Sequence, residues 1–432
     1  MERIVVMEDK MKANSIEEAL NLFDPQRPLL EEDDIKAYYV ARDNSPLAEM
    51  KTVLKTATDF PKLLFSGPPG CGKYSELANL RESLKKDFHI IMFSIKEISN
   101  VFSVSLEGML FHILKKIADK AKNEKLSIYT QKLEKIVSQQ SSEAPGIESI
   151  IPSKIEKRSE PTSGSITSDE DDEEDDDDLY KFIHKLTPRS TTKNTIELIN
   201  ETVWDLEEKT KKDVLIIVLD LDKISLSHIA TIFTKFSLYL TKINCFAVYT
   251  FPSEFKHYIN FLDVYRNFTG VYFLPNFAIY DRNGNPDESG RAKLKEIISK
   301  RLSPKLIYDE ATDLIIQLSG GVVHELINLV RQCCIVALME KINFIDDEIV
   351  RTAEQRIRKV YNSVYSDEVL QVLLQVKKGK KMIPNDTFFK LITQFSIIEY
   401  GLGDNLWYDI NPILNPLIEG LEAKEKEITQ GD

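Results

Sequence analysis

The stretch KLLFSGPPGCGKYSELANL, residues 62–80, decides how this chain is interpreted. An apolar run at 63–65 is typical of a β-strand, and a helix-like segment begins at Tyr74. Between them lies a glycine-rich turn that ends in Lys73. Strand, glycine-rich turn and helix in this order are the context of a phosphate-binding loop. Glycines let backbone N–H groups converge on an anion and the lysine adds a mobile charge, so the stretch predicts a polyphosphate site.

The loop departs from the usual pattern at the position that holds a metal. Tyr74 stands where a Ser or Thr would bind Mg²⁺. Ser75 follows, but it lies about 100° further around the helix and points elsewhere. We therefore expect Mg²⁺ to be held weakly or indirectly. The loop residues predicted to contact the ligand are Gly67, Pro68, Pro69, Gly70, Cys71, Gly72, Lys73, Tyr74 and Ser75.

Length and composition describe a globular chain of several folding units. The chain has 432 residues, of which 42% are hydrophobic and 29% charged, and this is too long for one ordinary core. The longest aliphatic run, Val214–Leu219, is far too short to span a bilayer. The N-terminal MERIVVMEDKMK carries acidic residues that a signal peptide lacks. These observations predict a cytoplasmic protein with no membrane partner.

The net charge of −13 is concentrated in one segment. Residues 169–178 are ten consecutive acids, which leaves about −3 for the rest of the chain. Adjacent like charges repel and cannot pack, so we predict that 138–178 is a disordered insertion. It could bind a basic partner or mimic nucleic acid, although a solvated loop is the favoured interpretation. The four cysteines form no CxxC pair, which argues against a zinc site or a disulfide framework.

A second motif lies at residues 214–223, VLIIVLDLDK. Its continuous β-branched run is typical of a central strand buried on both faces. Acidic residues at the carboxyl end of such a strand lie where open α/β sheets bind ligands. Asp220 is predicted to order Mg²⁺ through water, and Asp222 is the nearest second carboxylate. Thr250 ends the next strand and could polarise an attacking water, although many strands end in Thr for no such reason.

The whole chain alternates strand-like and helix-like segments up to residue 275. This order predicts an α/β fold, a doubly wound parallel sheet with helices on both faces. The five strand segments are 63–65, 89–94, 214–219, 245–250 and 271–274. The predicted organisation is a lead-in at 1–45, a core at 46–275, a helical lid at 276–362, a winged-helix-like domain at 363–420 and a tail at 421–432.

The order and spacing of these motifs resemble those of prokaryotic AAA+ ATPases, in the branch near the origin-recognition and STAND-type P-loop NTPases. The resemblance covers about residues 33–420, and the phosphate-binding loop is its specific part. The segments that carry it are YYVAR at 38–42, SPL at 45–47, the loop at 67–75, the strand at 214–223, VYTFP at 248–252, LPN at 274–276, DR at 281–282, GGV at 320–322 and WYDINP at 407–412. It implies ATP, ADP and Mg²⁺ as ligands.

The resemblance also implies roles for individual residues. Lys73 would hold the β- and γ-phosphates, and Asp220 would be the Walker B acid. Thr250 would be the sensor on the fourth strand. Arg266 is similar to the arginine that reaches the nucleotide of a neighbouring subunit, which implies a homo-oligomer.

Three more residues lie where such ATPases contact the ligand. Tyr39 and Arg42 precede the core, in the neighbourhood that covers the adenine, and either could contact the base. Plain packing of the tyrosine explains that position equally well. His324 follows the Gly320-Gly321 break in the lid, where relatives often carry a sensing arginine.

The positions that depart from the resemblance share one function, which is hydrolysis. They are Tyr74, His324 and Leu221, which stands where a Glu would follow Asp220 as general base. Phosphate binding needs the loop amides and Lys73, and these are intact. We hypothesise an ATP-binding regulatory switch with weak or absent hydrolysis. The alternatives are an active Mg²⁺-ATPase, with Ser75 or water completing the metal shell, and a DNA-binding protein that uses the winged helix.

The DNA alternative has weak support in the sequence. The candidate recognition helix, 385–394, contains Lys390 as its single basic residue, and Asp386 opposes it. The lysines at 377–381 would give weak, salt-sensitive phosphate contacts. A protein partner therefore ranks above DNA for this domain.

Overall fold

The computed structural model describes residues 12–97, 105–123 and 188–430. The predicted acidic insertion at 138–178 lies outside the described residues. The chain divides into two compact units. The smaller is Val104–Lys211 with Lys242–Asn244, and in its described part helix α6 (Leu106–Asn123) packs against helix α9 (Pro188–Thr210). All elements described below belong to the larger unit.

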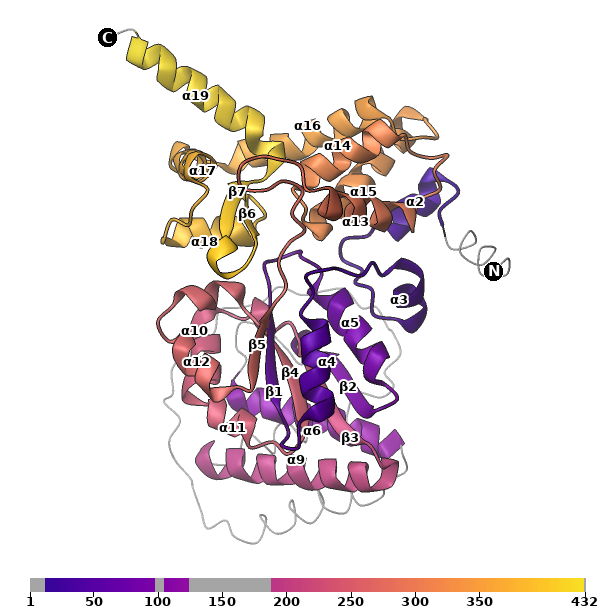
Figure 1. The fold of residues 1–432 in the computed structure, drawn as a ribbon, viewed down its shortest axis with the longest axis vertical. Helices are drawn as coiled ribbons and strands as arrows, with labels where there is room; N and C mark the ends of the chain where they lie inside the picture. The colour runs from indigo at the N-terminus through magenta and orange to yellow at the C-terminus, as the bar shows by residue number, and fades with distance from the viewer. Residues whose placement is uncertain (1–11, 98–104, 124–187, 431–432) are drawn as a thin grey trace, which may run out of the picture. The chain divides into compact units, whose positions relative to one another are not determined.

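Five parallel strands form one sheet in the order β2-β3-β4-β1-β5 (Figure 1). The strands are β1 (Lys62–Ser66), β2 (Phe88–Ser94), β3 (Asp213–Leu219), β4 (Phe246–Phe251) and β5 (Gly270–Phe273). This confirms the predicted parallel sheet of an α/β P-loop fold. Phe65 pairs with Thr250, and Val218 pairs with Tyr249, so β1, β3 and β4 end at the same edge.

Helices cover both faces of this sheet. On one face α4 (Leu47–Thr56) and α5 (Lys73–Leu84) share a core with alternate residues of the strands. On the other face the ring of Phe233 lies 5.2 Å from that of Phe251. All residues from Val214 to Leu219 are buried, as the uninterrupted aliphatic run predicts for a central strand.

The sequence between the third and fourth strands predicts one helix at 227–240, and the structure interrupts it. The segment forms α10 (Leu226–Ala230), a π-helical turn at Thr231–Lys235 and α11 (Ser237–Thr241). The hydroxyl of Thr234 donates to the carbonyl of Ala230 at 2.5 Å. The same kind of bond, from Thr202 to Leu198, lies within the unbroken helix α9, so it does not by itself explain the break.

Beyond β5 the chain becomes helical, as expected for the lid at 276–362. Its helices are α13 (Glu288–Ser299), α14 (Asp309–Ser319), α15 (Val323–Glu340) and α16 (Asp347–Val364). Helix α2 (Ile16–Leu22) from the lead-in packs into the same core, with Phe23 fully buried there (Figure 1). The guanidinium of Arg331 donates to the carbonyl of Leu20 at 2.7 Å. The first part of the lead-in therefore packs as part of the lid.

The last part of the chain has two helices, a hairpin and a terminal helix. These are α17 (Asp367–Gly379), α18 (Asp386–Thr393), β6 (Ile397–Tyr400), β7 (Trp407–Ile410) and α19 (Asn415–Gln430). Helices followed by an antiparallel hairpin are the order expected at 363–420, and the winged-helix interpretation stays a prediction. Helix α19 continues through the boundary placed at 420, so the expected tail is helical up to Gln430.

Within the described ranges, no helix combines the length and apolar character needed to cross a membrane. In the same residues, His, Cys, Asp and Glu side chains form no group of three that could hold a metal ion. The four cysteines are buried thiols.

Candidate phosphate-binding site

The glycine-rich turn joins β1 to α5 as the sequence predicts. Gly70 and Gly72 have φ angles of 70° and 101°, in the left-handed region that favours glycine. Gly72 caps α5, so the first N–H groups of the helix are available to an anion. The turn therefore presents amide dipoles and Lys73 at the carboxyl edge of the sheet.

This turn lines a cavity of about 1230 Å³. From the loop, the cavity is lined by Gly67, Pro69, Gly70, Gly72, Lys73, Tyr74 and Ser75. Two predicted loop contacts lie elsewhere. Cys71 is buried in the core between α5 and the sheet, and Pro68 is outside the described residues that line the cavity. Asp220 and Asp222 line the same cavity, so the structure brings the two predicted motifs together.

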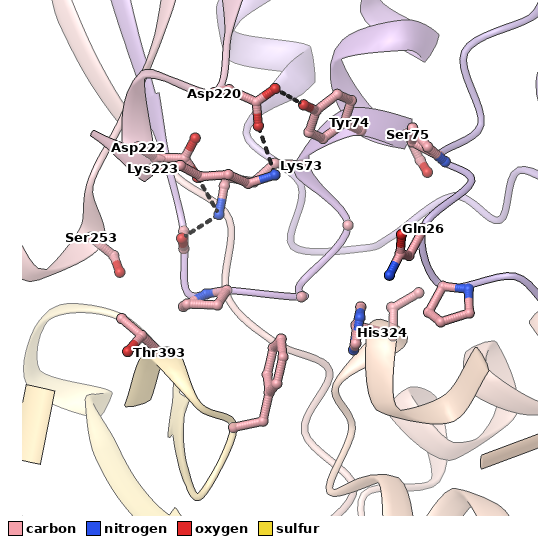
Figure 2. A pocket seen from close by; sticks show the side chains of 18 of the residues that line it. Gln26, Lys73, Tyr74, Ser75, Asp220, Asp222, Lys223, Ser253, His324 and Thr393 are labelled. Atoms are coloured by element: carbon pink, nitrogen blue, oxygen red, sulfur yellow. Dashed lines mark hydrogen bonds and ion pairs between the residues drawn. The ribbon is translucent and has the colours of Figure 1, made fainter. Parts of the chain in front are cut away.

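Lys73 is buried and held by three oxygen atoms. Its Nζ atom donates to the carbonyls of Gly67 at 2.7 Å and Pro68 at 3.1 Å, and pairs with Asp222 at 3.1 Å (Figure 2). Burial lowers the pKa of Lys73, but the charge and hydrogen bond of Asp222, together with Cys71 and Glu254, outweigh it, so the pKa lies above its ordinary value. Lys73 is therefore a fixed positive charge inside the cavity.

Asp220 is surrounded by four donors. The hydroxyl of Tyr74 donates to its Oδ2 atom (Figure 2). The hydroxyl of Ser94 donates to the same atom at 2.5 Å. The Nζ atoms of Lys223 and Lys96 lie 2.6 Å and 3.8 Å from Oδ1. Burial raises the pKa of Asp220, but the bonds from Lys223, Ser94 and Tyr74 outweigh it, and the pKa lies below its ordinary value. Asp220 is therefore an ionised carboxylate whose partners are protein groups.

Thr250 supports the turn that carries Asp220. Its Oγ1 atom accepts from the N–H of Leu221 at 2.9 Å and donates to the carbonyl of Val218 at 3.3 Å. It lies outside the set of described residues that line the cavity. Backbone groups engage this hydroxyl on both sides, and the water-polarising or sensor role expected for Thr250 stays a prediction.

Arg42 and Tyr39 lie behind the phosphate-binding loop. Arg42 donates to the carbonyls of Cys71 and of Pro275, the second at 2.9 Å. The hydroxyl of Tyr39 lies 3.2 Å from the carboxylate of Glu76. Among the described residues, neither belongs to the cavity wall, and the expected adenine contacts stay a prediction.

The predicted lid residue lies at the cavity. The backbone N–H of His324 donates to the carbonyl of Gly70 at 3.1 Å, and its ring stacks on Phe395 with centroids 4.7 Å apart. A methyl group added at Gly70 would lie 2.7 Å from Phe395 and 2.8 Å from His324. The lid and the last domain therefore both contact the phosphate-binding loop.

Arg266 is exposed on α12 (Phe261–Asn267) and lies outside the described residues that line this cavity. The role inferred for it needs a neighbouring subunit and stays a prediction.

Several residues that line the cavity were not predicted from the sequence. They are the segment 24–30, Ser94, Lys96, Lys223, Glu254 and Phe395. Ser94 and Lys96 follow β2 at the sheet edge where ligands bind, so the topology could have indicated them. Burial raises the pKa of Glu254 above its ordinary value, and the nearby Lys73 only partly opposes this. The sequence of 24–30 does not indicate a place in the cavity wall, because the position of this segment depends on the packing of α2.

The donor set does not fit a directly bound magnesium ion. Mg²⁺ requires near-octahedral oxygen ligands, and the position of the usual hydroxyl ligand is taken by Tyr74. Burial, together with the hydrogen bond to Asp220, raises the pKa of this phenol, so it stays protonated and acts as a donor. Lys223 places a positive charge on the same carboxylate. We therefore assign no metal ligand here, and Asp220 as a ligand through water stays a prediction.

The sheet, its glycine-rich turn and the acids at the same edge define the class, an α/β fold of the P-loop type. No protein-family model and no curated protein matches the sequence.

Three solved structures are similar to the chain at low sequence identity. The Aeropyrum pernix ORC2 protein, in ADPNP–ADP complexes, is 10% identical over 95% of this chain and 98% of that chain, with a TM-score of 0.44. Cdc6p from Pyrobaculum aerophilum is 12% identical over 94% and 98%, with a TM-score of 0.44. The Thermotoga maritima RuvB Holliday junction branch migration motor is 11% identical over 91% and 98%, with a TM-score of 0.40.

Proposed function

We propose that the chain is an ATP-binding protein of AAA+ type that acts as a nucleotide-controlled switch with slow or absent hydrolysis. One observation carries the proposal. The groups that bind phosphate face the cavity, while the hydroxyl of Tyr74 is bonded to Asp220. The affiliation with the origin-recognition and STAND-type branch is part of the proposal and rests on the sequence motifs.

The binding half of the site supports a polyphosphate ligand. Lys73 is paired with Asp222 and two loop carbonyls, and a phosphate would offer the same ammonium stronger, fully ionised acceptors. The N-terminus of α5 adds unpaired N–H groups and the positive end of the helix dipole. Together these groups supply what the β- and γ-phosphates require.

The hydrolytic half of the site supports slow turnover. A general base must reach the attacking water. Leu221 stands at the position after Asp220 and is fully buried, so it offers no base. Asp220 itself is occupied by Tyr74, Ser94 and Lys223. Bound ATP would therefore persist, as a switch requires.

The switching element would be the contact between the loop, the lid and the last domain. His324 and Phe395 pack around Gly70, next to the place where phosphates would bind. A ligand shifts such an equilibrium only if it interacts differently with the two states. Phosphates at Gly70 would alter the His324–Phe395 contact and so change the orientation of the last domain.

The test is calorimetry of ATP and ADP binding, together with steady-state turnover. We expect binding by the native chain, loss of binding in Lys73→Ala, and turnover well below that of ordinary ATPases, whose typical rates are on the order of 1–1000 per second. Lys305→Ala, an exposed lysine outside the described cavity wall, is the control and should bind normally. Rapid Mg²⁺-dependent hydrolysis that Lys73→Ala abolishes would overturn the switch.

One observation favours a second candidate, an active ATPase. Glu254 lines the cavity beside Lys73, and burial raises the pKa of its carboxyl, as suits a general base. Glu254→Gln separates the two candidates. An active enzyme would lose turnover by at least about tenfold while keeping its ATP affinity, whereas in a slow switch the residual turnover would not change.

The partner of the last domain is proposed to be a protein. Asp386, Phe389, Lys390 and Thr393, spaced along one side of α18, line the nucleotide cavity, which leaves this side unsuited to a DNA groove. A duplex titration across salt concentrations tests this, because DNA binding would give a steep dependence. A cytoplasmic location and a homo-oligomer that uses Arg266 complete the proposal.

A further inference from the structure

We infer that the site carries its own cation: the ammonium of Lys223 takes the place of Mg²⁺, and ATP is bound without a metal. The inference rests on the proposed function, since it concerns the same site. Its starting point is the Nζ atom of Lys223, 2.6 Å from the carboxylate of Asp220. In other P-loop proteins a magnesium ion is held near this acid and neutralises the phosphates.

The position of Lys223 is set by a tight turn and not by a flexible loop. Asp220 adopts a left-handed conformation, with φ 65°, and opens the short 3₁₀ turn Leu221–Lys223. The N–H of Lys223 donates to the carbonyl of Asp220 at 3.0 Å. Leu221 is buried and its N–H is held by Thr250. The turn therefore directs the lysine side chain back onto the acid three residues before it.

The aromatic ring at the metal position supports the same ammonium. The Nζ atom of Lys223 lies 5.2 Å from the ring centroid of Tyr74, within the range of a cation–π contact. The hydroxyl of that ring donates to the other oxygen of Asp220. Tyr74 thus replaces a metal ligand and at the same time faces a cation that metal-binding sites do not have.

Lys223 also has N–H donors that are available to a ligand. An ammonium carries three N–H groups and is a compact point charge. Its side chain is 47% exposed and lines the cavity beside Lys73. Lys96, 3.8 Å from the same carboxylate, adds a third positive charge at this end of the cavity. The ammonium groups of Lys73, Lys96 and Lys223 lie near the carboxyl groups of Asp220, Asp222 and Glu254, and Lys223 keeps N–H donors for the phosphates.

The decisive measurement uses the native chain and no variants. ATP is titrated by calorimetry in excess MgCl₂ and again in EDTA. We expect the two dissociation constants to agree within about fivefold, because the ammonium replaces the charge of the metal. Weakening by more than about fivefold in EDTA would overturn the inference. Failure to bind ATP in both buffers would instead overturn the proposed function.

Two variants then assign the effect to Lys223. Lys223→Met keeps the aliphatic stem and should bind ATP at least about tenfold more weakly in EDTA, as expected for loss of a charge-assisted contact. The matched control is Lys305→Met, which removes an exposed lysine outside the described cavity wall and should bind like the native chain. Native affinity of Lys223→Met in EDTA would contradict the inference.

The double variant Tyr74→Ser with Lys223→Met tests whether the site becomes dependent on Mg²⁺ when the ammonium of Lys223 is removed. It introduces a hydroxyl ligand and frees Asp220, which are the two groups that a magnesium ion lacks here. ATP should then bind at least about tenfold more tightly in MgCl₂ than in EDTA. An equal affinity of this double variant in the two buffers would overturn the inference.

Discussion

The hydroxyl of Tyr74 donates a hydrogen bond to the carboxylate of Asp220, across 146 positions of the sequence. The bond joins the start of α5 to the end of β3, the two elements from which a P-loop protein builds its metal site. It uses the acid that would order the ion and the position that would supply its hydroxyl ligand. This contact is the reason to expect weak catalysis.

The first prediction concerns Tyr74→Ser. The shorter side chain removes one of the donors to Asp220 and offers a hydroxyl to a metal, so Mg²⁺ should tighten ATP binding by several-fold, on the order of 1 kcal/mol, with little change in EDTA. Calorimetry in the two buffers measures this. Tyr74→Phe is the control, because it breaks the bond to Asp220 without supplying a ligand. If serine and phenylalanine behave alike, the metal interpretation of this position is wrong.

The second prediction concerns Thr250→Val. The substitution is nearly isosteric but leaves the buried N–H of Leu221 without its 2.9 Å acceptor. A buried donor without a partner costs about 1–3 kcal/mol, so the free energy of unfolding should fall by that amount. Urea denaturation measures it. Thr250→Ser retains the hydroxyl and should lose less than half as much. ATP affinity should fall with Val as well, because the turn that carries Lys223 is loosened.

The third prediction concerns Gly70→Ala. Gly70 has a φ of 70°, and an added methyl group would lie under 3 Å from Phe395, His324 and Val322. Gly284→Ala is a matched control, since Gly284 has a φ of 88° but no atom within 4 Å of the added methyl. Both variants carry backbone strain of about 1 kcal/mol, and Gly70→Ala should lose about 1–3 kcal/mol more from the clash. Limited proteolysis at 276–290 should also accelerate in Gly70→Ala alone. Equal losses of stability would show that the lid and last domain do not press on the loop.

The fourth prediction is a pH dependence that arises from Lys62. The side chain is 3% exposed and donates to the carbonyls of Phe60 and Cys245. Burial lowers the pKa of Lys62 to about 8, from an ordinary value of 10.5. Between these two values the unfolded chain binds more protons than the folded one, so this lysine makes the free energy of unfolding rise with pH.

Lys62→Met should therefore change how steeply the free energy of unfolding rises with pH. Between pH 7 and pH 9.5 the stability of the native chain relative to Lys62→Met should rise by about 2 kcal/mol, whatever the offset at pH 7. Denaturation curves at the two pH values measure this difference. The same substitution at Lys305 controls for general charge effects. A constant difference between native chain and variant would mean that Lys62 is not desolvated in the folded state.

Much of the fold could be predicted from periodicity. The uninterrupted run Val214–Leu219 indicates a strand buried on both faces, and the structure has this strand. The sequence predicts one helix at 227–240, but the segment forms two short α-helices separated by a π-helical turn. Helix boundaries that depend on packing, such as the end of α19, also could not be predicted from local propensity.

The candidate site also has features that the local sequence predicts and features that depend on packing. Glycine positions and the Gly72-Lys73 pair define a phosphate-binding turn locally, since backbone conformation and a neighbouring charge are encoded within a few residues. The two hydroxyls that bond to Asp220 are not local. Tyr74 and Ser94 come from two other elements, and only the stacking of parallel strands brings them to one edge of the sheet.

The same distinction explains Arg42 and Lys223. Arg42 precedes the core in sequence, but the fold turns its guanidinium towards the back of the loop. Lys223 lies three residues after Asp220 in the sequence. Its contact with Asp220 depends on a left-handed turn that Thr250 holds in place. A linear chain specifies which groups can bind a phosphate through short-range backbone geometry. Which carboxylates, hydroxyls and ammonium groups remain available to it is decided by long-range packing, because charge pairing requires contact between elements distant in the chain.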